Sequence, residues 1–471
     1  MEIKSAWMKL RWLSLTLILL LAFPFGQAHA QDTLPPGPVY VVQAGDNIWA
    51  IAQQFGLSVD ELVNYNHIAD PNLLKIGDRL VIPRLEDIQG ELKIVVVPYG
   101  ETQRSLSRRY QLPETMLARL NHLASPDLLY TGANLVILDT GAALQPTRRG
   151  RLAPGESLLE QAVIQDTDSW SLVSLNHLTG NWDGLPGDVL VAPGEGESGP
   201  GALPPEIVSF TITPLPLIQG KTIVLRVTAS SGTGVTGSLA GHTLNFFPDG
   251  QGQSVALQGI YALQEPGLYP LDLSVVLPDG ASFQFNQSVR VVEGAYIYDP
   301  TLYVDPATID PEVTRPEDAE WNALAAPVTL EKLWSGVFLS PVAPEFSGCF
   351  PSRFGNRRSY NDGPYNYFHT GLDFCGAVGN AIFASASGVV VFAGPLSVRG
   401  NATMINLGWG VYTAYMHQSE ILVQVGDQVE AGQQIGMVGA TGRVTGAHLH
   451  FEVWVGGVQV DPMDWLGQAY P

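Results

Sequence analysis

Residues 39–66 read VYVVQAGDNIWAIAQQFGLSVDELVNYN, and the pattern of this stretch returns twice at a fixed interval of 55 residues. Alternating apolar residues at its start predict a strand, and the Gly-Asp pair that follows predicts the start of a helix. Apolar residues at helical spacing and a closing strand at 80–83 complete a β-α-α-β order in under 50 residues. The three ungapped copies share aligned residues that include Gly45, Gly100 and Gly155; Leu62, Leu117 and Leu172; Asn66, Asn121 and Asn176; His67, His122 and His177; and Gly77, Gly132 and Gly187.

The first copy continues to LKIGDRLVIP at residues 74–83 and resembles LysM, a small glycan-binding module. The resemblance implies binding to N-acetylglucosamine polymers, either peptidoglycan or chitin, in a groove beside the turn formed by Asp46, Asn47 and Ile48. We place the LysM repeats at 38–84, 93–139 and 148–193. The second and third are degenerate, since Trp49 is replaced in them by Arg104 and Leu159, so each either binds glycan or serves as a spacer. We expect the repeat histidines to be structural, capping or packing locally.

The N-terminus is typical of an exported protein. Residues 1–30 combine a positive start, a short apolar core from Leu13 to Phe23 and a small-x-small site at 28–30, which predicts a cleaved secretory signal peptide; the alternative is an uncleaved anchor. No later run of about 20 apolar residues follows, so we expect a secreted or cell-envelope protein, periplasmic or wall-associated, without a membrane span after signal removal. The net charge of −21 and the lack of a later basic run argue against nucleic-acid binding.

The middle of the chain changes from repeats to short strands. Residues 194–206, GEGESGPGALPPE, predict a flexible linker. Residues 207–293 contain some seven short apolar stretches with Pro-Asp-Gly turns at 248–250 and 278–280, which favours an immunoglobulin-like β-sandwich with a spacer or docking role. Residues 294–339 form a Pro-rich connecting segment, with one helix expected around 319–334, that wraps onto the next domain.

Cys349 and Cys375 are the two cysteines of the chain. An even cysteine count in an exported protein, with both residues in the last third, predicts a disulfide. The alternative is two buried free thiols; a metal site is disfavoured because no CxxC spacing is present.

Four of the nine histidines lie in the last 103 residues. His369 and Asp373 are four apart in an extended stretch, so they could share one ion only if the chain bends at Thr370-Gly371. His448 and His450, in GAHLHFEV, occupy one face of a strand, and His417 ends another. Two imidazoles and a carboxylate suit zinc with an open fourth position; the alternative is four satisfied structural histidines.

The same residues closely match the LytM/lysostaphin family of zinc metallo-endopeptidases, whose motifs are His-x-x-x-Asp, Tyr-x-His and His-x-His. The match covers roughly 340–467, which we place as the peptidase domain, and includes SRFGNRR, GVVVFAG and the terminal DPMDWL. The resemblance implies that His369, Asp373 and His450 bind Zn²⁺, that His448 is the general base and that His417 stabilises the transition state. Spacing alone leaves open which of His448 and His450 is the ligand.

We therefore expect a multidomain, mainly β protein with α+β modules: three βααβ LysM-type repeats, an Ig-like sandwich and an all-β LytM-type peptidase domain. The predicted function is a secreted peptidoglycan hydrolase, a zinc endopeptidase that cuts stem or cross-bridge peptides while LysM modules bind wall glycan. Two alternatives are a non-catalytic LytM-like activator of another wall hydrolase and a structural glycan-binding wall protein.

Overall fold

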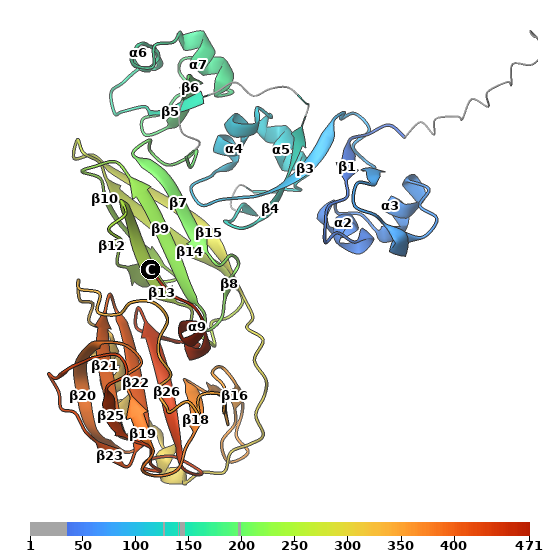
Figure 1. The fold of residues 1–471 in the computed structure, drawn as a ribbon. Coiled ribbons are helices and arrows are strands. Elements are labelled where there is room, and N and C mark those ends of the chain that lie inside the picture. Colours follow the sequence, from blue (N-terminus) through green and yellow to red (C-terminus); the bar gives the residue numbers. More distant parts are fainter. Residues whose placement is uncertain (1–34, 126–127, 140, 142–146, 196–198) are drawn as a thin grey trace, which may run out of the picture. The chain divides into compact units, whose positions relative to one another are not determined.

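The computed structural model describes residues 35–125, 128–139, 141, 147–195 and 199–471 (Figure 1). The predicted signal peptide, residues 1–30, lies outside the described residues. Within the described ranges, no helix has both the length and the apolar character needed to cross a bilayer. The chain forms two compact units. The first comprises the residues up to Leu92 together with Asp139–Gly141, and the second comprises Lys93–Leu138 and Ala142–Pro471.

The first unit holds the first repeat. Strands β1 and β2 pair antiparallel, and the N-terminal helix ends are capped by the side chains of Asn47 and Ser58. Its core contains Tyr40, Ile51 and Leu62. The elements are β1 (Val39–Val41), α2 (Ile48–Gln54), α3 (Val59–Tyr65), the 3₁₀ turn η1 (Pro71–Leu73) and β2 (Arg79–Val81).

The repeated asparagine ties the second helix of each copy to the closing strand. The Asn66 amide donates to the carbonyls of Leu62 and Val81 and accepts from the Val81 N–H. The following residue, His67, takes a left-handed conformation with φ 51° and ends the helix. The same bonds surround Asn121 and Asn176, and the same φ occurs at His122 and His177.

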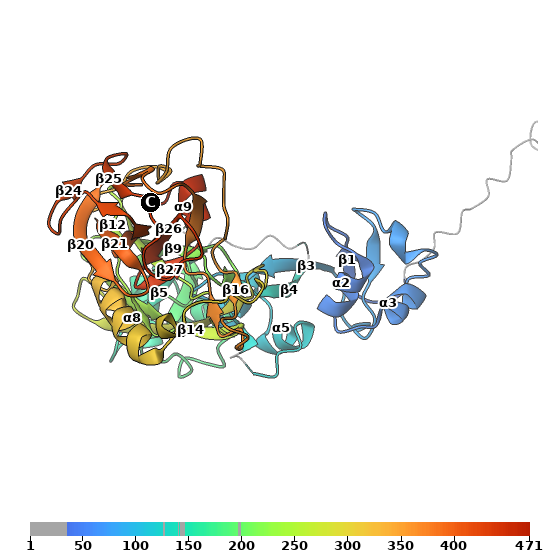
Figure 2. The ribbon, with the colours of Figure 1, turned by 90° about the horizontal axis from the view of Figure 1, so that it is seen from below.

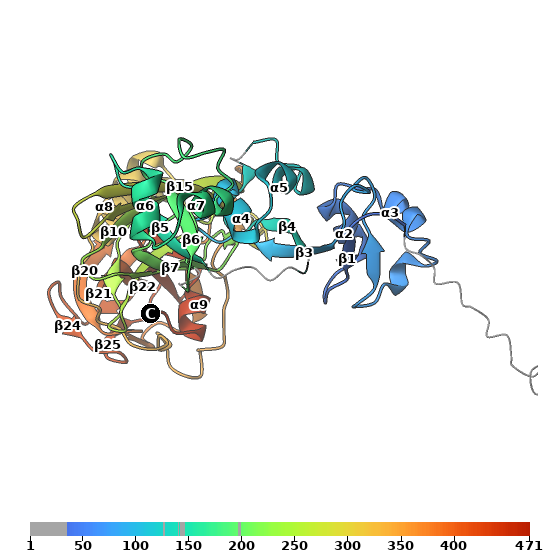
Figure 3. The same ribbon diagram turned by 90° about the horizontal axis from the view of Figure 1, so that it is seen from above.

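The second unit begins with two further segments of the same element order (Figure 3). The capping boxes at Thr102 and Ser157 start their first helices. The segment at 93–139 has β3 (Glu91–Val96), α4 (Gln103–Tyr110), α5 (Glu114–Leu120) and β4 (Asn134–Asp139). The segment at 147–193 has β5 (Thr147–Arg151), α6 (Leu158–Ile164), α7 (Ser169–Leu175) and β6 (Val189–Pro193).

Residues 207–293 form two mainly antiparallel sheets that share one core, ordered β11-β10-β14-β15-β8 and β12-β13-β9-β7. The structure has nine strands here, more than the sequence indicated, because the short edge strands β8, β11 and β12 carry little periodicity. The strands are β7 (Ile207–Thr213), β8 (Leu217–Ile218), β9 (Thr222–Ala229), β10 (Gly234–Leu239), β11 (His242–Leu244), β12 (Phe247–Pro248), β13 (Gln253–Gly259), β14 (Gly267–Val276) and β15 (Ser282–Val292).

The connecting segment carries a 3₁₀ turn η3 (Pro306–Thr308) and helix α8 (Pro311–Ala325), which packs beside β20 (Figure 2). The prediction of a helix around 319–334 was wrong in its limits. Asp310 caps the N-terminus and Pro311 fits the first turn, where the missing N–H costs nothing. The helix ends at Ala325, two residues before Pro327, which cannot continue a helix.

The C-terminal part is built on an antiparallel sheet ordered β18-β26-β22-β21-β20-β24, with β27 beside β26 and a small sheet β19-β25-β23. Helix α9 (Pro462–Gly467) closes the chain. The strands are β16 (Arg357–Arg358), β17 (Tyr367–Phe368), β18 (Leu372–Cys375), β19 (Ala381–Phe383), β20 (Gly388–Leu396), β21 (Gly400–Gly408), β22 (Val411–Gln418), β23 (Glu420–Ile421), β24 (Gln428–Val429), β25 (Gln434–Met437), β26 (His448–Val455) and β27 (Val458–Val460).

The two-sheet domain and the C-terminal part share one hydrophobic core. Phe247 stacks on Trp409 with ring centroids 4.8 Å apart, and Trp465 donates to Thr222. Lys221 bonds Asp461 and Asp464 at the edge of this contact. The sandwich therefore supports the C-terminal part through buried contacts in addition to the chain connection.

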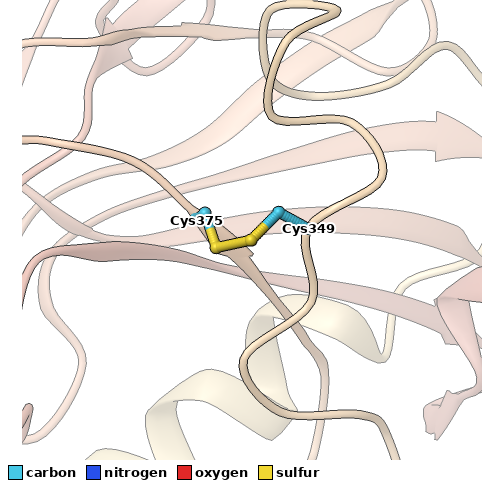
Figure 4. The surroundings of a disulfide bond; sticks show 2 residues. All are labelled: Cys349 and Cys375. Carbon is cyan, nitrogen blue, oxygen red and sulfur yellow. A yellow bond between two sulfur atoms is a disulfide. The ribbon is translucent and has the colours of Figure 1, made fainter.

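A disulfide joins Cys349 to Cys375 (Figure 4), with Cα atoms 5.5 Å apart. Cys375 ends β18, and its N–H also bonds the Cys349 carbonyl. The bridge therefore fixes the loop before β16 against the strand that carries Asp373.

Candidate metal centre

His369, Asp373 and His450 bring three donor atoms together in the C-terminal part. His369 Nε2 lies 3.0 Å from Asp373 Oδ1 and 2.9 Å from His450 Nδ1, and the Asp373 Oδ1 to His450 Nδ1 distance is 2.8 Å. All three residues are buried. Among the histidine, cysteine and acidic side chains of the described residues, these three lie close enough together to hold a metal ion.

The bend expected between His369 and Asp373 is present. Strand β17 ends at Phe368 and β18 starts at Leu372, so Thr370 and Gly371 form the break. A Cβ on Gly371 would lie 2.4 Å from the Phe451 carbonyl oxygen and 2.7 Å from His450 Nε2. Only glycine therefore lets this turn bring the two donor residues together beside His450.

The chemistry of the three donors fits zinc. Two atoms that each lie about 2.1 Å from a tetrahedral ion are roughly 3.4 Å apart, so an opening of about half an ångström would accommodate one. The ring nitrogens that face away are held: His369 Nδ1 contacts Ser352 Oγ and the Arg353 carbonyl, and His450 Nε2 contacts Glu452 Oε1 at 3.3 Å. Outer partners of this kind fix ring orientation and tautomer at metal sites.

His417 and His448 lie beside the three donors. The His417 ring centroid is 5.0 Å from that of His448 and 6.0 Å from that of His450. His417 sits at a bulge of β22 with φ 63°, and its Nδ1 contacts the Thr441 carbonyl at 2.8 Å. His448 Nδ1 contacts the Gly446 carbonyl, while its Nε2 lies 3.6 Å from Asp373 Oδ1. The bulge turns His417 toward the other histidines, and strained backbone of this kind gathers at functional sites.

Burial and neighbouring charges give the histidines different protonation states. Burial lowers the pKa of His369 to about 4 and that of His417 to about 3. Burial alone would lower the pKa of His450 as well, but Asp373 and Glu452 raise it to about 9. Burial would raise the pKa of Asp373, but His369 and His450 hold it well below 3.8. The two carboxylates thus favour the protonated form of the His450 imidazole.

Two cavities open onto this group. One, of about 490 Å³, is bounded by the connecting segment at 299–304 and by residues 443–448. The other, of about 620 Å³, is bounded by helix α8, by 261–264 of the sandwich and by Arg358. His369, His417 and His450 line both cavities. Both cavities therefore adjoin the donor group.

The residues predicted to contact glycan lie at the start of helix α2 in the first repeat. Asp46 accepts from the Gln43 N–H and the Tyr40 hydroxyl, and Asn47 caps α2 through the Ala50 N–H. Ile48 is half-buried at the start of that helix. The first two side chains are therefore engaged in shaping the turn, while the neighbouring Trp49 is 62% exposed. The sequence prediction did not include Trp49.

Sequence comparison identifies the parts of the chain. The profile of peptidase family M23 matches residues 367–462, and the LysM domain profile matches 40–83 and 95–137. The chain contains an M23 peptidase domain and two LysM domains. The M23 match includes all five residues of the histidine and aspartate group. The segment at 147–193 is not among the matched ranges, so its LysM character stays a prediction supported by its shared element order.

The relatives of the M23 domain include enzymes and an activator. Over 95 residues it is 44% identical to peptidoglycan DD-endopeptidase ShyA of Vibrio cholerae, covering 20% of this chain and 22% of that one. Murein hydrolase activator NlpD of Escherichia coli is 39% identical over 99 residues, or 21% and 26% of the two chains. The solved structure of a zinc containing peptidase from Vibrio cholerae is 15% identical, with a TM-score of 0.27, covering 90% of this chain and 98% of that one. The match to ShyA thus spans about a fifth of that relative's length.

Sequence reasoning missed the side chains that surround the M23 donors. Glu452 is fully enclosed, and burial would raise its pKa, yet His450 and Arg399 hold it at about 2. Its position two residues after His450 places it on the same strand face, which was an available signal. Ser352 and Arg358 also meet at the site, where Arg358 donates to Ser352 Oγ. Both lie in the SRFGNRR stretch that carries the family resemblance, which was the available signal, but neither was assigned a role.

Proposed function

We propose that the chain is a zinc-dependent endopeptidase of the cell envelope that cleaves stem or cross-bridge peptides of peptidoglycan. The observation that carries the proposal is the convergence of His369, Asp373 and His450, with His417 lining both adjoining cavities and His448 lining one of them. M23 membership and relatives named as peptidoglycan endopeptidases support it.

A zinc ion held by His369 Nε2, Asp373 Oδ1 and His450 Nδ1 would supply Lewis-acid polarisation of a water molecule and of the scissile carbonyl. His448 Nδ1 points to the Gly446 carbonyl, so a proton placed there leaves Nε2 as an acceptor facing the centre. His448 then takes a proton from the attacking water and later delivers it to the leaving amine.

His417 has the complementary role. Its Nδ1 lies 2.8 Å from the Thr441 carbonyl, so the neutral ring carries its proton there. Nε2 is then an acceptor, and the ring becomes a donor to the developing oxyanion only when it gains a second proton. Since burial lowers its pKa to about 3, the neutral ring is favoured, and its Nε2 would accept a hydrogen bond from the attacking water and orient it as the transition state forms.

The LysM domains would hold the enzyme on wall glycan, with contacts near Asp46, Asn47, Ile48 and Trp49. Binding at a tethered site raises the local concentration of peptide substrate for a cleft with modest affinity of its own. The resemblance to NlpD raises the alternative of a murein hydrolase activator. The complete donor set and both flanking histidines favour an enzyme.

The test is digestion of purified peptidoglycan by the full chain, with and without a chelator, followed by mass analysis of the released fragments. We expect cleaved peptides, with activity lost to the chelator and restored by zinc. Hydrolysis that persists in Asp373→Ala or in chelator would contradict the proposal. Absence of hydrolysis together with stimulation of a separate wall amidase would favour the activator.

A further inference from the structure

On the side away from the donor group, His450 contacts the carboxylate of Glu452, which accepts hydrogen bonds from two tryptophan indoles. Glu452 Oε1 lies 3.3 Å from His450 Nε2. Glu452 Oε2 accepts from Trp454 Nε1 at 2.7 Å and from Trp321 Nε1 at 3.2 Å. All of these side chains are buried. The two indole N–H groups occupy one carboxylate oxygen and leave the other for the imidazole.

Trp321 comes from helix α8, in the connecting segment outside residues 367–462. It is fully buried against Trp454 and Met416, and Met416 is the register partner of His450. The helix therefore reaches the outer side of the donor group from a separate part of the chain.

Helix α8 is anchored where it meets β20 and β21. Glu317 accepts from the backbone N–H groups of Val398 and Arg399 and from the Arg399 guanidinium at 2.9 Å. Arg399 also bonds Asp318 and lies over the Trp321 ring, 5.2 Å from its centroid. The Arg399 carbonyl accepts from the His417 N–H at 3.0 Å. The Glu317–Arg399 pair therefore contacts Trp321, which bonds the Glu452 partner of His450, and also bonds the backbone of His417.

We propose that Trp321 is a positioning residue of the metal centre, which holds Glu452 so that His450 presents Nδ1 to the metal. This inference rests on the proposed metal-dependent function. A buried carboxylate with only one donor on Oε2 can rotate, and the Nε2–H to Oε1 contact that fixes the imidazole then weakens. Helix α8 is accordingly a working part of the peptidase domain rather than a linker element.

The experiment compares tryptophan-to-phenylalanine changes that differ only in whether an N–H bond is lost. Trp321→Phe keeps an aromatic ring, although a smaller one, and removes the N–H donor to Glu452. Trp334→Phe is the matched control, because Trp334 is buried but its Nε1 has no hydrogen-bond partner within the described residues. Glu452→Gln removes the carboxylate itself. For each full-chain protein, zinc affinity is measured by competition with a chromophoric chelator, together with the visible spectrum of the cobalt(II) form and the melting temperature of the metal-free form.

We expect zinc affinity to fall about 10- to 100-fold in Trp321→Phe and Glu452→Gln, as for other outer partners of metal-binding histidines. The cobalt(II) spectrum should change in both, and Trp334→Phe should match the wild type in affinity and spectrum. Wild-type affinity and spectrum in Trp321→Phe would overturn the inference, even if its melting temperature fell, because the helix would then only contribute packing.

If Trp321→Phe does not fold, Glu317→Gln replaces it, since that change weakens the anchor of α8 while keeping the side-chain volume of this buried residue. A fall in zinc affinity with a changed cobalt(II) spectrum then supports the inference, and wild-type values of both overturn it. A wild-type chain that takes up neither zinc nor cobalt would overturn the proposed function itself, and the inference with it. That result differs from one in which the wild type binds metal and the variants bind it equally well.

Discussion

Asp373 and His450 are register partners on the antiparallel strands β18 and β26, and their donor atoms lie 2.8 Å apart. One pair of hydrogen-bonded strands therefore sets the distance between two of the three proposed ligands. His369 joins them through the turn at Gly371. The donor group is thus as rigid as the sheet that carries it.

Asp373→Ala should reduce zinc content from one ion per chain to a small fraction, because it removes a direct ligand and leaves two histidines. Elemental analysis of the purified full chain measures this. Ser340→Ala, in the same domain but away from the donors, serves as the control. Full zinc occupancy in Asp373→Ala would show that the zinc binds at another site.

His448→Ala and His450→Ala should behave differently, although the two residues are two positions apart. His450→Ala loses a ligand and therefore both zinc and wall hydrolysis. His448→Ala should keep zinc and lose at least 100-fold in hydrolysis rate, as expected when a general base is removed. Zinc content and turbidity loss of wall suspensions measure the two properties. Exchange of the two phenotypes would invert the assigned roles.

Reduction of the Cys349–Cys375 bridge should destabilise the C-terminal part. The bridge closes a loop of 26 residues, for which chain-entropy arguments give about 3 kcal/mol. Calorimetry of Cys349→Ser/Cys375→Ser should show a lower melting temperature for the main transition, with the transition of the first LysM domain unchanged. An unchanged main transition would contradict the stabilising role.

Lys221→Met should lower stability by the same amount at every pH between about 7 and 9. Burial alone would lower the pKa of Lys221, but Asp461 and Asp464 raise it above its ordinary 10.5. A raised folded-state pKa means that the stabilisation is fully present below pH 10.5 and is lost as the pH rises through the higher folded value. Melting temperatures of the wild type and the variant should therefore converge only above that pH. Convergence at pH 8 would argue against the ion pair as the cause.

Trp49→Ala should weaken sedimentation of the full chain with insoluble peptidoglycan while leaving cleavage of a soluble wall peptide unchanged. The reason is that Trp49 is the large exposed ring beside the predicted glycan turn, whereas the proposed metal centre lies in a different part of the chain. Leu159→Ala, at the equivalent and equally exposed position of the segment at 147–193, shows whether that segment contributes to binding.

The sequence predicted best what depends on local period and motif. The alternation in His448-Leu449-His450 placed both imidazoles on one face, and Leu449 is indeed fully buried on the other. The break at Thr370-Gly371 followed from strand geometry, and the repeat histidines end helices as expected.

Features that depend on tertiary contacts were beyond the reach of the sequence. The bulge that turns His417 forms because β21 and β22 shift register, and no residue type announces such a shift. The bond between Trp321 and Glu452 joins residues 131 positions apart. The predicted helix began too late, after Pro316, which lies inside α8 although proline usually breaks a helix, and it ran too far, past Pro327.

The packing of Phe247 on Trp409 determines how the protein can be shortened. A recombinant fragment that began at residue 340 would lack Phe247, which covers Trp409, and Lys221, which pairs with Asp461 and Asp464. It would also lose Trp321 and present an uncovered aromatic surface to solvent, a liability for solubility. Because Tyr99 is buried in the sandwich core against Phe210 and Phe285, a minimal fragment for crystallisation or inhibitor screening has to start at about Lys93 and run to the end of the chain.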